Sequence, residues 1–222
     1  MGCVTLIRMS ARLAAITSAL VCAATMLAVA PSATADPCSD IQVVFARGTD
    51  DTPGLGRVGD AFSSTLSTLV GGRSLTTYGV NYPASYDFLA AADGATDAAN
   101  FISTLTQQCP STRIVLGGYS QGAAVVDMLA GIPPLGNKIG EVGSAPPLPA
   151  SLVPYVTAVA VFGNPATKFS IPVTSSVFGG RAIDLCKDGD PICSRGRNPF
   201  AHSDYVSAGL TNQAASFVAG LV

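Results

Sequence analysis

The chain of 222 residues has 12 basic and 14 acidic side chains, so it is nearly neutral, and its Lys and Arg form no run. This excludes the basic patch of a nucleic-acid-binding surface and gives no attraction to an anionic membrane. No internal repeat or low-complexity tract divides the chain, so one domain is expected.

The first 35 residues have the pattern of a secretory signal peptide. Arg8 and Arg12 give a positive start, an uncharged apolar stretch follows from 13 to 30, and Ala33-Thr34-Ala35 is a small-x-small cleavage site. The alternative is a retained membrane anchor, because the apolar stretch is long enough to span a bilayer. Cleavage would leave residues 36–222 as a single domain that is long enough to bury a sizeable core.

Taken in chain order, the apolar pattern alternates strands with helices. Strands are expected at 41–47, 75–80, 113–117, 158–162 and 182–185, and helices at 58–70, 93–108, 123–130 and 203–221. The segment 132–154 holds six prolines and is expected to be a surface excursion. Fully apolar strands such as 158–162 are typical of a parallel sheet covered on both faces. The alternation therefore predicts an α/β fold, a three-layer sandwich around a parallel sheet.

The segment Gly118-Tyr119-Ser120-Gln121-Gly122 joins one predicted strand to the next predicted helix. In that context G-x-S-x-G is typical of a nucleophile elbow, a sharp turn that exposes a serine hydroxyl. The turn crowds the backbone, and the two flanking glycines relieve the crowding because they lack a Cβ. The alternative is a glycine-rich turn between two core elements, since a chain with 23 glycines produces short glycine patterns by chance.

A serine nucleophile needs a base, and His202 is the only histidine. It follows the last predicted strand, where it can reach a serine at the carboxyl edge of the sheet. The acid that orients it is expected between the serine and the histidine in the chain. Asp127 lies along the elbow helix, where it is expected to point elsewhere, and Asp184 lies inside a strand. Asp188 and Asp190 remain, and spacing alone does not separate them.

Two backbone N–H groups are needed to stabilise the oxyanion. The N–H of Gln121, directly after the nucleophile, is the first. Thr49, in the loop after the first strand, is the candidate for the second, through its N–H and its hydroxyl; the alternative is a simple turn-forming role. Four aromatic residues are predicted to contact the substrate, namely Tyr82, Tyr86, Phe88 and Phe200.

After cleavage of the leader, four cysteines would be left. An even number in an exported chain predicts two disulfides. Cys186 and Cys193 enclose a short loop and are expected to pair locally, which leaves Cys38 to pair with Cys109. A single histidine and the lack of a C-x-x-C motif argue against a zinc site, and no metal or cofactor is expected.

The motifs, in their order along the chain, resemble those of the cutinase family, and more closely the cutinase-like proteins of actinobacteria. They are Ala46-Arg47-Gly48-Thr49, Gly117-Gly118-Tyr119-Ser120-Gln121-Gly122, Cys186-x-x-x-Asp190-x-x-Cys193 and His202-x-x-Tyr205. The resemblance covers nearly all of 36–222. It implies a small α/β-hydrolase with a five-stranded parallel sheet, Asp190 as the acid, Thr49 as an oxyanion donor, and the two disulfides named above. The sequence shows no long amphipathic segment near the elbow that could act as a lid, so the site is expected to be lidless.

The function that the resemblance implies is a serine esterase that acts on ester or lipid substrates, and the leader pattern implies that it is secreted. A lidless site with few apolar walls predicts a preference for short to medium acyl chains. The protein is expected to be a monomer in transient contact with a lipid or cell-wall surface. The loops that would line the acyl crevice differ from those of fungal cutinases, so cutin itself is not implied. The alternatives are a phospholipase, a thioesterase or a serine peptidase on the same triad. A non-catalytic secreted antigen or binding protein is a further alternative, against which the complete triad argues.

Overall fold

The structure is a computed structural model, which describes residues 38–133, 135 and 142–222. Residues Asp36–Val222 form one compact unit. The predicted signal peptide, residues 1–35, lies outside the described residues. Within the described part, no helix is both long and apolar enough to span a bilayer.

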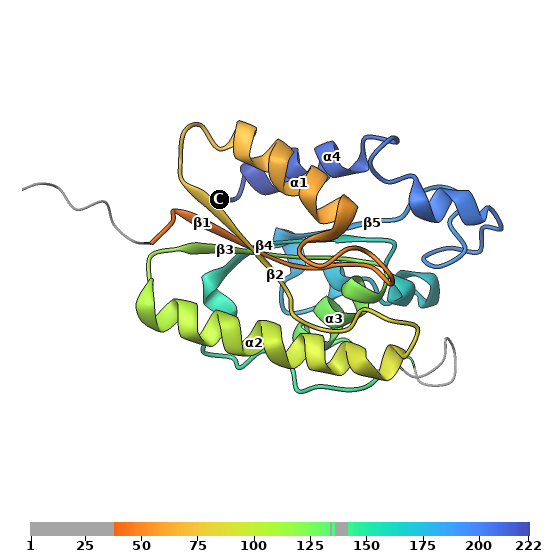
Figure 1. The fold of residues 1–222 in the computed structure, drawn as a ribbon, viewed down its shortest axis with the longest axis horizontal. Helices are drawn as coiled ribbons and strands as arrows, with labels where there is room; N and C mark the ends of the chain where they lie inside the picture. Colours follow the sequence, from red (N-terminus) through yellow and green to blue (C-terminus); the bar gives the residue numbers. More distant parts are fainter. Residues whose placement is uncertain (1–37, 134, 136–141) are drawn as a thin grey trace, which may run out of the picture. The chain divides into compact units, whose positions relative to one another are not determined.

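A five-stranded sheet, all parallel, forms the centre of the fold, as the sequence predicted (Figure 1). The strand order is β2-β1-β3-β4-β5, so the elbow strand β3 is central. The strands are β1 (Ile41–Ala46), β2 (Leu75–Gly79), β3 (Arg113–Tyr119), β4 (Val156–Phe162) and β5 (Ala182–Leu185). β1, β3 and β4 are buried almost throughout because their side chains are apolar on both faces.

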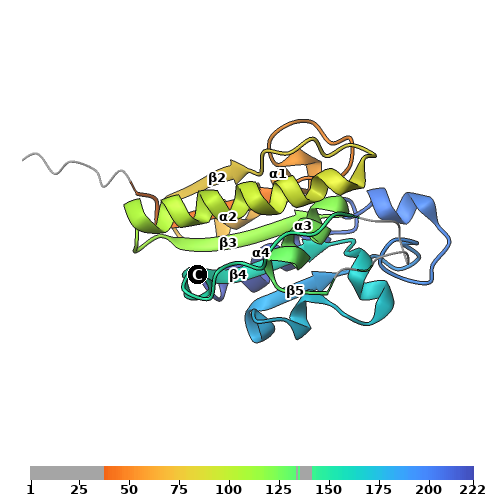
Figure 2. The same ribbon diagram turned by 90° about the horizontal axis from the view of Figure 1, so that it is seen from below.

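Two pairs of helices cover the sheet, one pair on each face (Figure 1). The helices are α1 (Gly56–Leu69) and α4 (Leu210–Ala219) on one face, and α2 (Ala91–Gln108) and α3 (Gln121–Leu129) on the other. Figure 2 views the molecule from the side of α2 and α3. Phe62 of α1 packs with Phe45 and Phe162 of the sheet, and the three ring centroids lie 6.0 to 6.3 Å apart. The predicted three-layer sandwich is therefore confirmed.

The last helix is shorter than the sequence predicted. A helix was expected over 203–221, but α4 begins at Leu210, after the 3-10 turn Pro199–Ser203 and a run of turns. Gly209 has a φ of 73°, which a continuous α-helix does not allow. This interruption lets Tyr205 turn inward, where it is fully buried.

Both predicted disulfides are present. Cys38–Cys109 ties the residues before β1 to the end of α2, and Cys186–Cys193 closes the loop after β5. Segment 132–154, the predicted excursion, is described only in part. Segment 170–180 contains the 3-10 turn Val173–Ser175 and the start of a second one, Gly179–Arg181. Its Val173 and Phe178 are buried in the core, so it packs against the body of the protein.

Candidate active site

The turn between β3 and α3 holds Ser120 in a backbone conformation that L-residues rarely adopt, with φ 55° and ψ −115°. A Cβ on Gly118 would overlap the Gly122 carbonyl, and a Cβ on Gly122 would overlap the Ala46 carbonyl. The two glycines are thus required by close approach of backbone to backbone. The turn is fixed from the neighbouring strand by the Ser120 N–H, which donates to Phe162. The serine hydroxyl is therefore presented at the carboxyl edge of the sheet.

His202 lies between this serine and a carboxylate. Its Nε2 lies 2.8 Å from Ser120 Oγ, and its Nδ1 lies 2.8 Å from Asp190 Oδ2. A carboxylate facing Nδ1 holds the proton on that nitrogen, so Nε2 is free to accept the serine proton. Asp188, which spacing could not separate from Asp190, is exposed. The structure thus brings Ser120, His202 and Asp190 together.

Asp190 is fully buried and is surrounded by donors. The Ile192 N–H donates to Oδ1 at 2.7 Å, and the Tyr205 hydroxyl donates to Oδ2 at 2.6 Å, the oxygen that also faces His202. Burial on its own raises the pKa of Asp190, but the hydrogen bonds from His202, Tyr205 and Ile192 together hold it below its ordinary value. The carboxylate therefore stays ionised beside the imidazole.

Two tyrosines that the sequence analysis gave no role position the histidine. The Tyr119 hydroxyl donates to the His202 carbonyl, and its ring stacks on the imidazole with centroids 5.1 Å apart. The Tyr205 ring meets the imidazole edge-on, and its hydroxyl also accepts from the Lys187 N–H at 3.2 Å. The sequence feature that could have identified Tyr205 is its place in the His202-x-x-Tyr205 motif. Tyr119 could have been identified from its place in the elbow motif, directly before Ser120.

The two predicted oxyanion donors come from the start of α3 and from the loop after β1, and both residues line the same pocket as Ser120. Within the described residues, neither the Thr49 N–H nor the Gln121 N–H has a protein acceptor, so both donors are available to an oxyanion. Gln121 is also the first residue of α3, where the helix dipole favours negative charge. The Thr49 hydroxyl is engaged elsewhere, since it donates to Gln121 Oε1 at 3.2 Å.

Arg47 holds the loop after β1, which carries Thr49, against the loop after β2. Its guanidinium is buried and donates to the carbonyls of Val80, Tyr82 and Pro83, and to that of Asp51. In return, the Tyr82 hydroxyl donates to the Arg47 carbonyl. The loop after β1 and the loop after β2 are therefore joined around one buried cation.

The structure corrects part of the predicted substrate contacts. Tyr82 is 5% exposed and belongs to the core, because it packs on Arg47 instead of facing the pocket. Phe200 is 79% exposed and lies outside the pocket lining, because the 3-10 turn that carries it directs it to solvent. Tyr86 and Phe88 do line the pocket.

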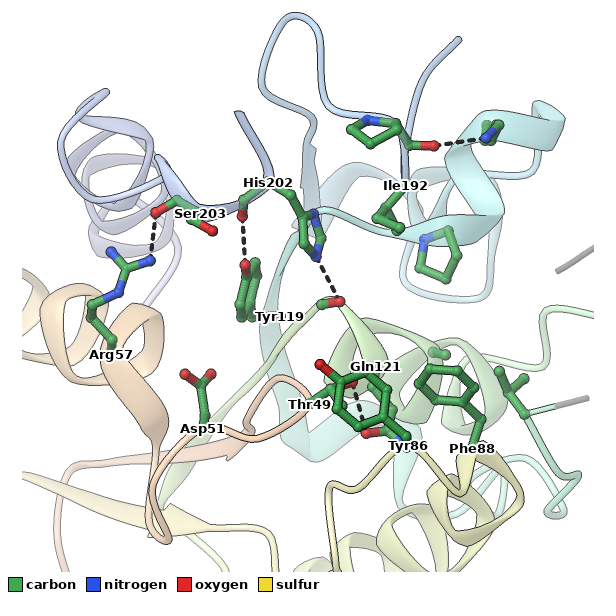
Figure 3. A pocket seen from close by; sticks show the side chains of 16 residues that line it. Thr49, Asp51, Arg57, Tyr86, Phe88, Tyr119, Gln121, Ile192, His202 and Ser203 are labelled. Carbon is green, nitrogen blue, oxygen red and sulfur yellow. Dashed lines mark hydrogen bonds between the residues drawn. The ribbon is translucent and has the colours of Figure 1, made fainter. Parts of the chain in front are cut away.

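A pocket of about 650 Å³ surrounds the serine and has two unlike ends (Figure 3). One end is mainly apolar, and its walls come from Tyr86, Phe88, Ala124, Val142, Pro165 and Ile192. The exposed Lys168 also lines the pocket, and its ammonium donates to the Pro191 carbonyl at 2.7 Å. The other end is polar, and Asp51, Arg57 and Ser203 line it. Ser120 and His202 lie between them, so a bound ester would have one substituent in each end.

Behind the elbow helix lies a pair of acids, Asp127 and Asp184, that the sequence analysis set aside as partners of the histidine. Asp127 is 5% exposed and accepts from Asn164 Nδ2, which also donates to Asp184. Burial, reinforced by the negative charge of Asp184, raises the pKa of Asp127 well above its ordinary value. Neither acid is near enough to the histidine to serve it, and both instead fix the start of the turn after β4.

Comparison with known sequences identifies related proteins over most of the chain. A family model described as cutinase matches residues 37–222. The chain is 49% identical over 216 residues to phospholipase Culp4 of Mycobacterium tuberculosis, covering 95% of this chain and 92% of that protein. It is 46% identical over 197 residues to carboxylesterase Culp1 of the same species, covering 85% of this chain and 84% of that protein.

Solved structures give the same fold. A Trichoderma reesei cutinase in complex with a phosphonate inhibitor superposes with a TM-score of 0.66 at 36% identity, covering 84% of this chain and 78% of the other. An acetylxylan esterase superposes with a TM-score of 0.68 at 29% identity, covering 83% and 99%.

Proposed function

Because the chain belongs to the cutinase family, we propose that it is a serine esterase that hydrolyses carboxylic esters with short to medium acyl chains through an acyl-enzyme. The observation that carries the proposal is the linked pair of 2.8 Å contacts from Ser120 to His202 and from His202 to Asp190. The family relatives named carboxylesterase and phospholipase act on ester bonds by their names, and this supports the same chemistry here.

In the first half of the reaction, Ser120 Oγ attacks the ester carbonyl while His202 Nε2 accepts its proton. The carbonyl oxygen becomes an oxyanion, which the N–H groups of Thr49 and Gln121 stabilise. Asp190 steadies the imidazolium that forms. Collapse of the intermediate breaks the bond to the alcohol oxygen, and Nε2 returns the proton to the departing alcohol.

In the second half, water takes the place of the alcohol. His202 removes a proton from the water, whose oxygen attacks the acyl carbon, and the oxyanion again lies against Thr49 and Gln121. When the intermediate collapses, the proton passes from Nε2 to Ser120 Oγ. The carboxylic acid leaves, and the serine and histidine are restored to their starting state.

The apolar end of the pocket is the place for the acyl chain, since apolar surface is buried there most favourably. Each methylene gains about 0.8 kcal/mol only while wall is present to cover it. Tyr86 and Ile192 are 74% and 37% exposed, so this wall is open to solvent at its rim. A short or medium chain is therefore expected to fill it.

Export is also part of the proposal. Two disulfides form stably in oxidising compartments, and the first 35 residues have a leader pattern. We propose a secreted or cell-wall-associated monomer that acts without a metal or cofactor.

The proposal is tested by reaction with a fluorophosphonate, which labels an activated serine. One adduct is expected, on the peptide that contains Ser120, and it should be lost in Ser120→Ala. Asp190→Asn should slow the labelling strongly, whereas the matched change Asp188→Asn, at an exposed position in the same loop, should leave the labelling rate nearly at the parent value. Labelling of Ser120→Ala at the parent rate, or slow labelling only in Asp188→Asn, would contradict the assignment.

A second candidate is phospholipid hydrolysis on the same triad, because the relative at 49% identity is named a phospholipase. Release of fatty acid from short-chain phosphatidylcholine, compared with release from the matching triglyceride, would separate the two.

A further inference from the structure

Two opposite charges line the polar end of the pocket without pairing with each other. Asp51 Oδ2 accepts the Gly48 N–H at 3.0 Å, and Arg57 donates one N–H to the Ser203 carbonyl. Among the described residues, the contact between His202 and Asp190 is the one acid–base pair within 4.0 Å. The second carboxylate oxygen of Asp51 and the remaining N–H groups of Arg57 are therefore free to meet a ligand.

The position of these charges relative to the histidine indicates which part of a substrate they would meet. Figure 3 shows Arg57, Ser203 and Asp51 on one side of His202, with Ile192 and Phe88 on the other. An ester carbonyl at the serine carries an acyl chain and an alcohol, and the apolar end suits the acyl chain. The alcohol is then directed toward Asp51 and Arg57.

The chemistry of this end discriminates between classes of alcohol. A simple alkyl group would remove water from both charges and give neither a partner, which costs free energy. A phosphate would be attracted by Arg57 but repelled by Asp51 on the same wall. A hydroxyl group both donates and accepts, so neighbouring hydroxyls can donate to the carboxylate and accept from the guanidinium.

We propose that Asp51 and Arg57 form an alcohol subsite that selects esters of polyhydroxylated alcohols, such as glycerol or a sugar. The proposal rests on the esterase function and specifies its substrate class. The burial of Asp51 supports the proposal independently. Burial raises the pKa of Asp51, whereas the positive charge of the nearby Arg57 lowers it. The Asp51 carboxylate is therefore partly removed from water.

The test compares esters that share one acyl group. The value of kcat/KM is measured for ethyl butyrate, glyceryl monobutyrate and 6-O-butyryl glucose with the full secreted protein. The readout is the ratio of each polyol ester to ethyl butyrate, because a general loss of activity cancels in the ratio. Hydrogen bonds to charged groups give a ratio of about ten or more in the parent. Preference for the glycerol ester or for the sugar ester identifies which polyol fits.

Two variants test the named residues. Asp51→Asn keeps an oxygen for the Gly48 N–H and removes the charge; Arg57→Met keeps an apolar stem of similar length and removes the donors. Each should lower the ratio several-fold. Arg113→Met is the matched control, because Arg113 is exposed at the opposite end of β3 from the elbow, and it should keep the parent ratio.

A second measurement isolates the alcohol subsite from the acyl step. With p-nitrophenyl butyrate as donor, added glycerol and 1-propanol compete with water for the same acyl-enzyme, each forming its butyrate ester and restoring Ser120. Glycerol should capture the acyl group better than 1-propanol in the parent, and Asp51→Asn and Arg57→Met should remove that advantage.

A parent ratio near one, or a high ratio that neither variant lowers, would overturn the subsite while leaving the esterase function in place. A higher kcat/KM for 1-butyryl-glycerophosphocholine than for glyceryl monobutyrate, lost in Arg57→Met, would replace the polyol by a charged head group. Failure to hydrolyse any of these esters, ethyl butyrate included, would instead count against the proposed function itself.

Discussion

At the scale of single residues, the position of His202 depends on the hydrogen bonds that the Asp190 carboxylate accepts. Asp190 Oδ2 faces His202 and also accepts from Tyr205. Burial raises the pKa of Tyr205, and the bond to Asp190 raises it further, so the phenol keeps its proton and acts as the donor. Tyr205 thereby fixes which oxygen the imidazole meets and draws negative charge away from it.

Tyr205→Phe should change the pH dependence as well as the rate. Without the hydroxyl, Asp190 Oδ2 has more negative charge and holds the imidazolium more strongly, so the acid limb of kcat/KM should move to higher pH. The loss of a charged hydrogen bond should lower kcat/KM about tenfold. The pH profile on p-nitrophenyl butyrate measures both effects.

Tyr119→Phe is the matched control, since the Tyr119 hydroxyl binds the His202 carbonyl and not Asp190. It should lower the rate without moving the acid limb. If Tyr205→Phe also left the limb in place, Tyr205 would serve packing alone.

The proposed catalytic residues could be predicted from the sequence because the chain offers few candidates for each role. One histidine and one G-x-S-x-G elbow gave Ser120 and His202, and the family resemblance chose Asp190 over Asp188. The contacts of aromatic residues could not be predicted in this way. Tyr82 was expected to bind substrate, but it packs against Arg47, whose buried cation attracts its ring and whose carbonyl accepts its hydroxyl.

At the scale of elements, Asp190, the proposed catalytic acid, lies on a loop that a disulfide closes. Cys186–Cys193 spans a separation of 7 residues around Asp190, whereas Cys38–Cys109 spans 71 residues and joins β1 to α2. Cys193 Sγ also lies 3.3 Å from the Tyr205 hydroxyl. The two disulfides are therefore expected to have different roles.

Replacing both cysteines of the long loop by serine should destabilise the fold by about 4 kcal/mol in the chain-entropy model, against about 2.5 kcal/mol for the short loop. The short-loop variant should lose more activity at a temperature where both remain folded, because Asp190 is released. Urea denaturation and kcat/KM are measured side by side on the two double variants. Equal losses of both quantities would refute this division.

The elbow helix contains a second element-scale feature, the buried carboxyl of Asp127. Its pKa in the folded protein lies well above the model-compound value of 3.8. Between those two values the folded state binds more protons than the unfolded state, so stability falls as pH rises through that range. Asp127→Asn removes this titration and keeps an oxygen for Asn164.

The free energy of unfolding should therefore decline less between pH 5 and pH 8 in Asp127→Asn than in the parent. Urea titrations at intervals across that range provide the comparison. A difference between variant and parent that stayed constant with pH would show that Asp127 does not titrate in it.

Helix boundaries show where sequence patterns fail at this scale. Apolar periodicity predicted all five strands and three of the helices to within two residues at each end, because these elements bury apolar side chains in the core. It extended the last helix back to 203, where the structure has turns until Gly209. The apolar spacing of 203–221 fits a helix, but Tyr205 lies in a turn and is buried beside Asp190, which the spacing does not indicate.

At the scale of the whole molecule, substrate reach depends on what covers the pocket. No residue of 170–180 lines it, and Val173 and Phe178 anchor that segment in the core. The apolar wall also ends at the exposed side chains Tyr86 and Ile192. The site is therefore expected to take short or medium chains without a closing movement.

Rates on p-nitrophenyl esters from acetate to palmitate should peak at short to medium chains, with no jump above the solubility limit of the substrate. The series is measured below and above that limit for each ester. A maximum at palmitate with a sharp rise at the interface would show instead that part of the chain closes over the site.

The central claim is that Ser120 and His202 act as one unit in ester hydrolysis. The most direct measurement is kcat on p-nitrophenyl butyrate for the parent, Ser120→Ala, His202→Ala and the double variant. Each single change should lower kcat by several orders of magnitude, and the double variant should lose little more than either, because each loss already disables the same step. Hydrolysis by Ser120→Ala at near the parent rate, or losses that multiply in the double variant, would contradict the account.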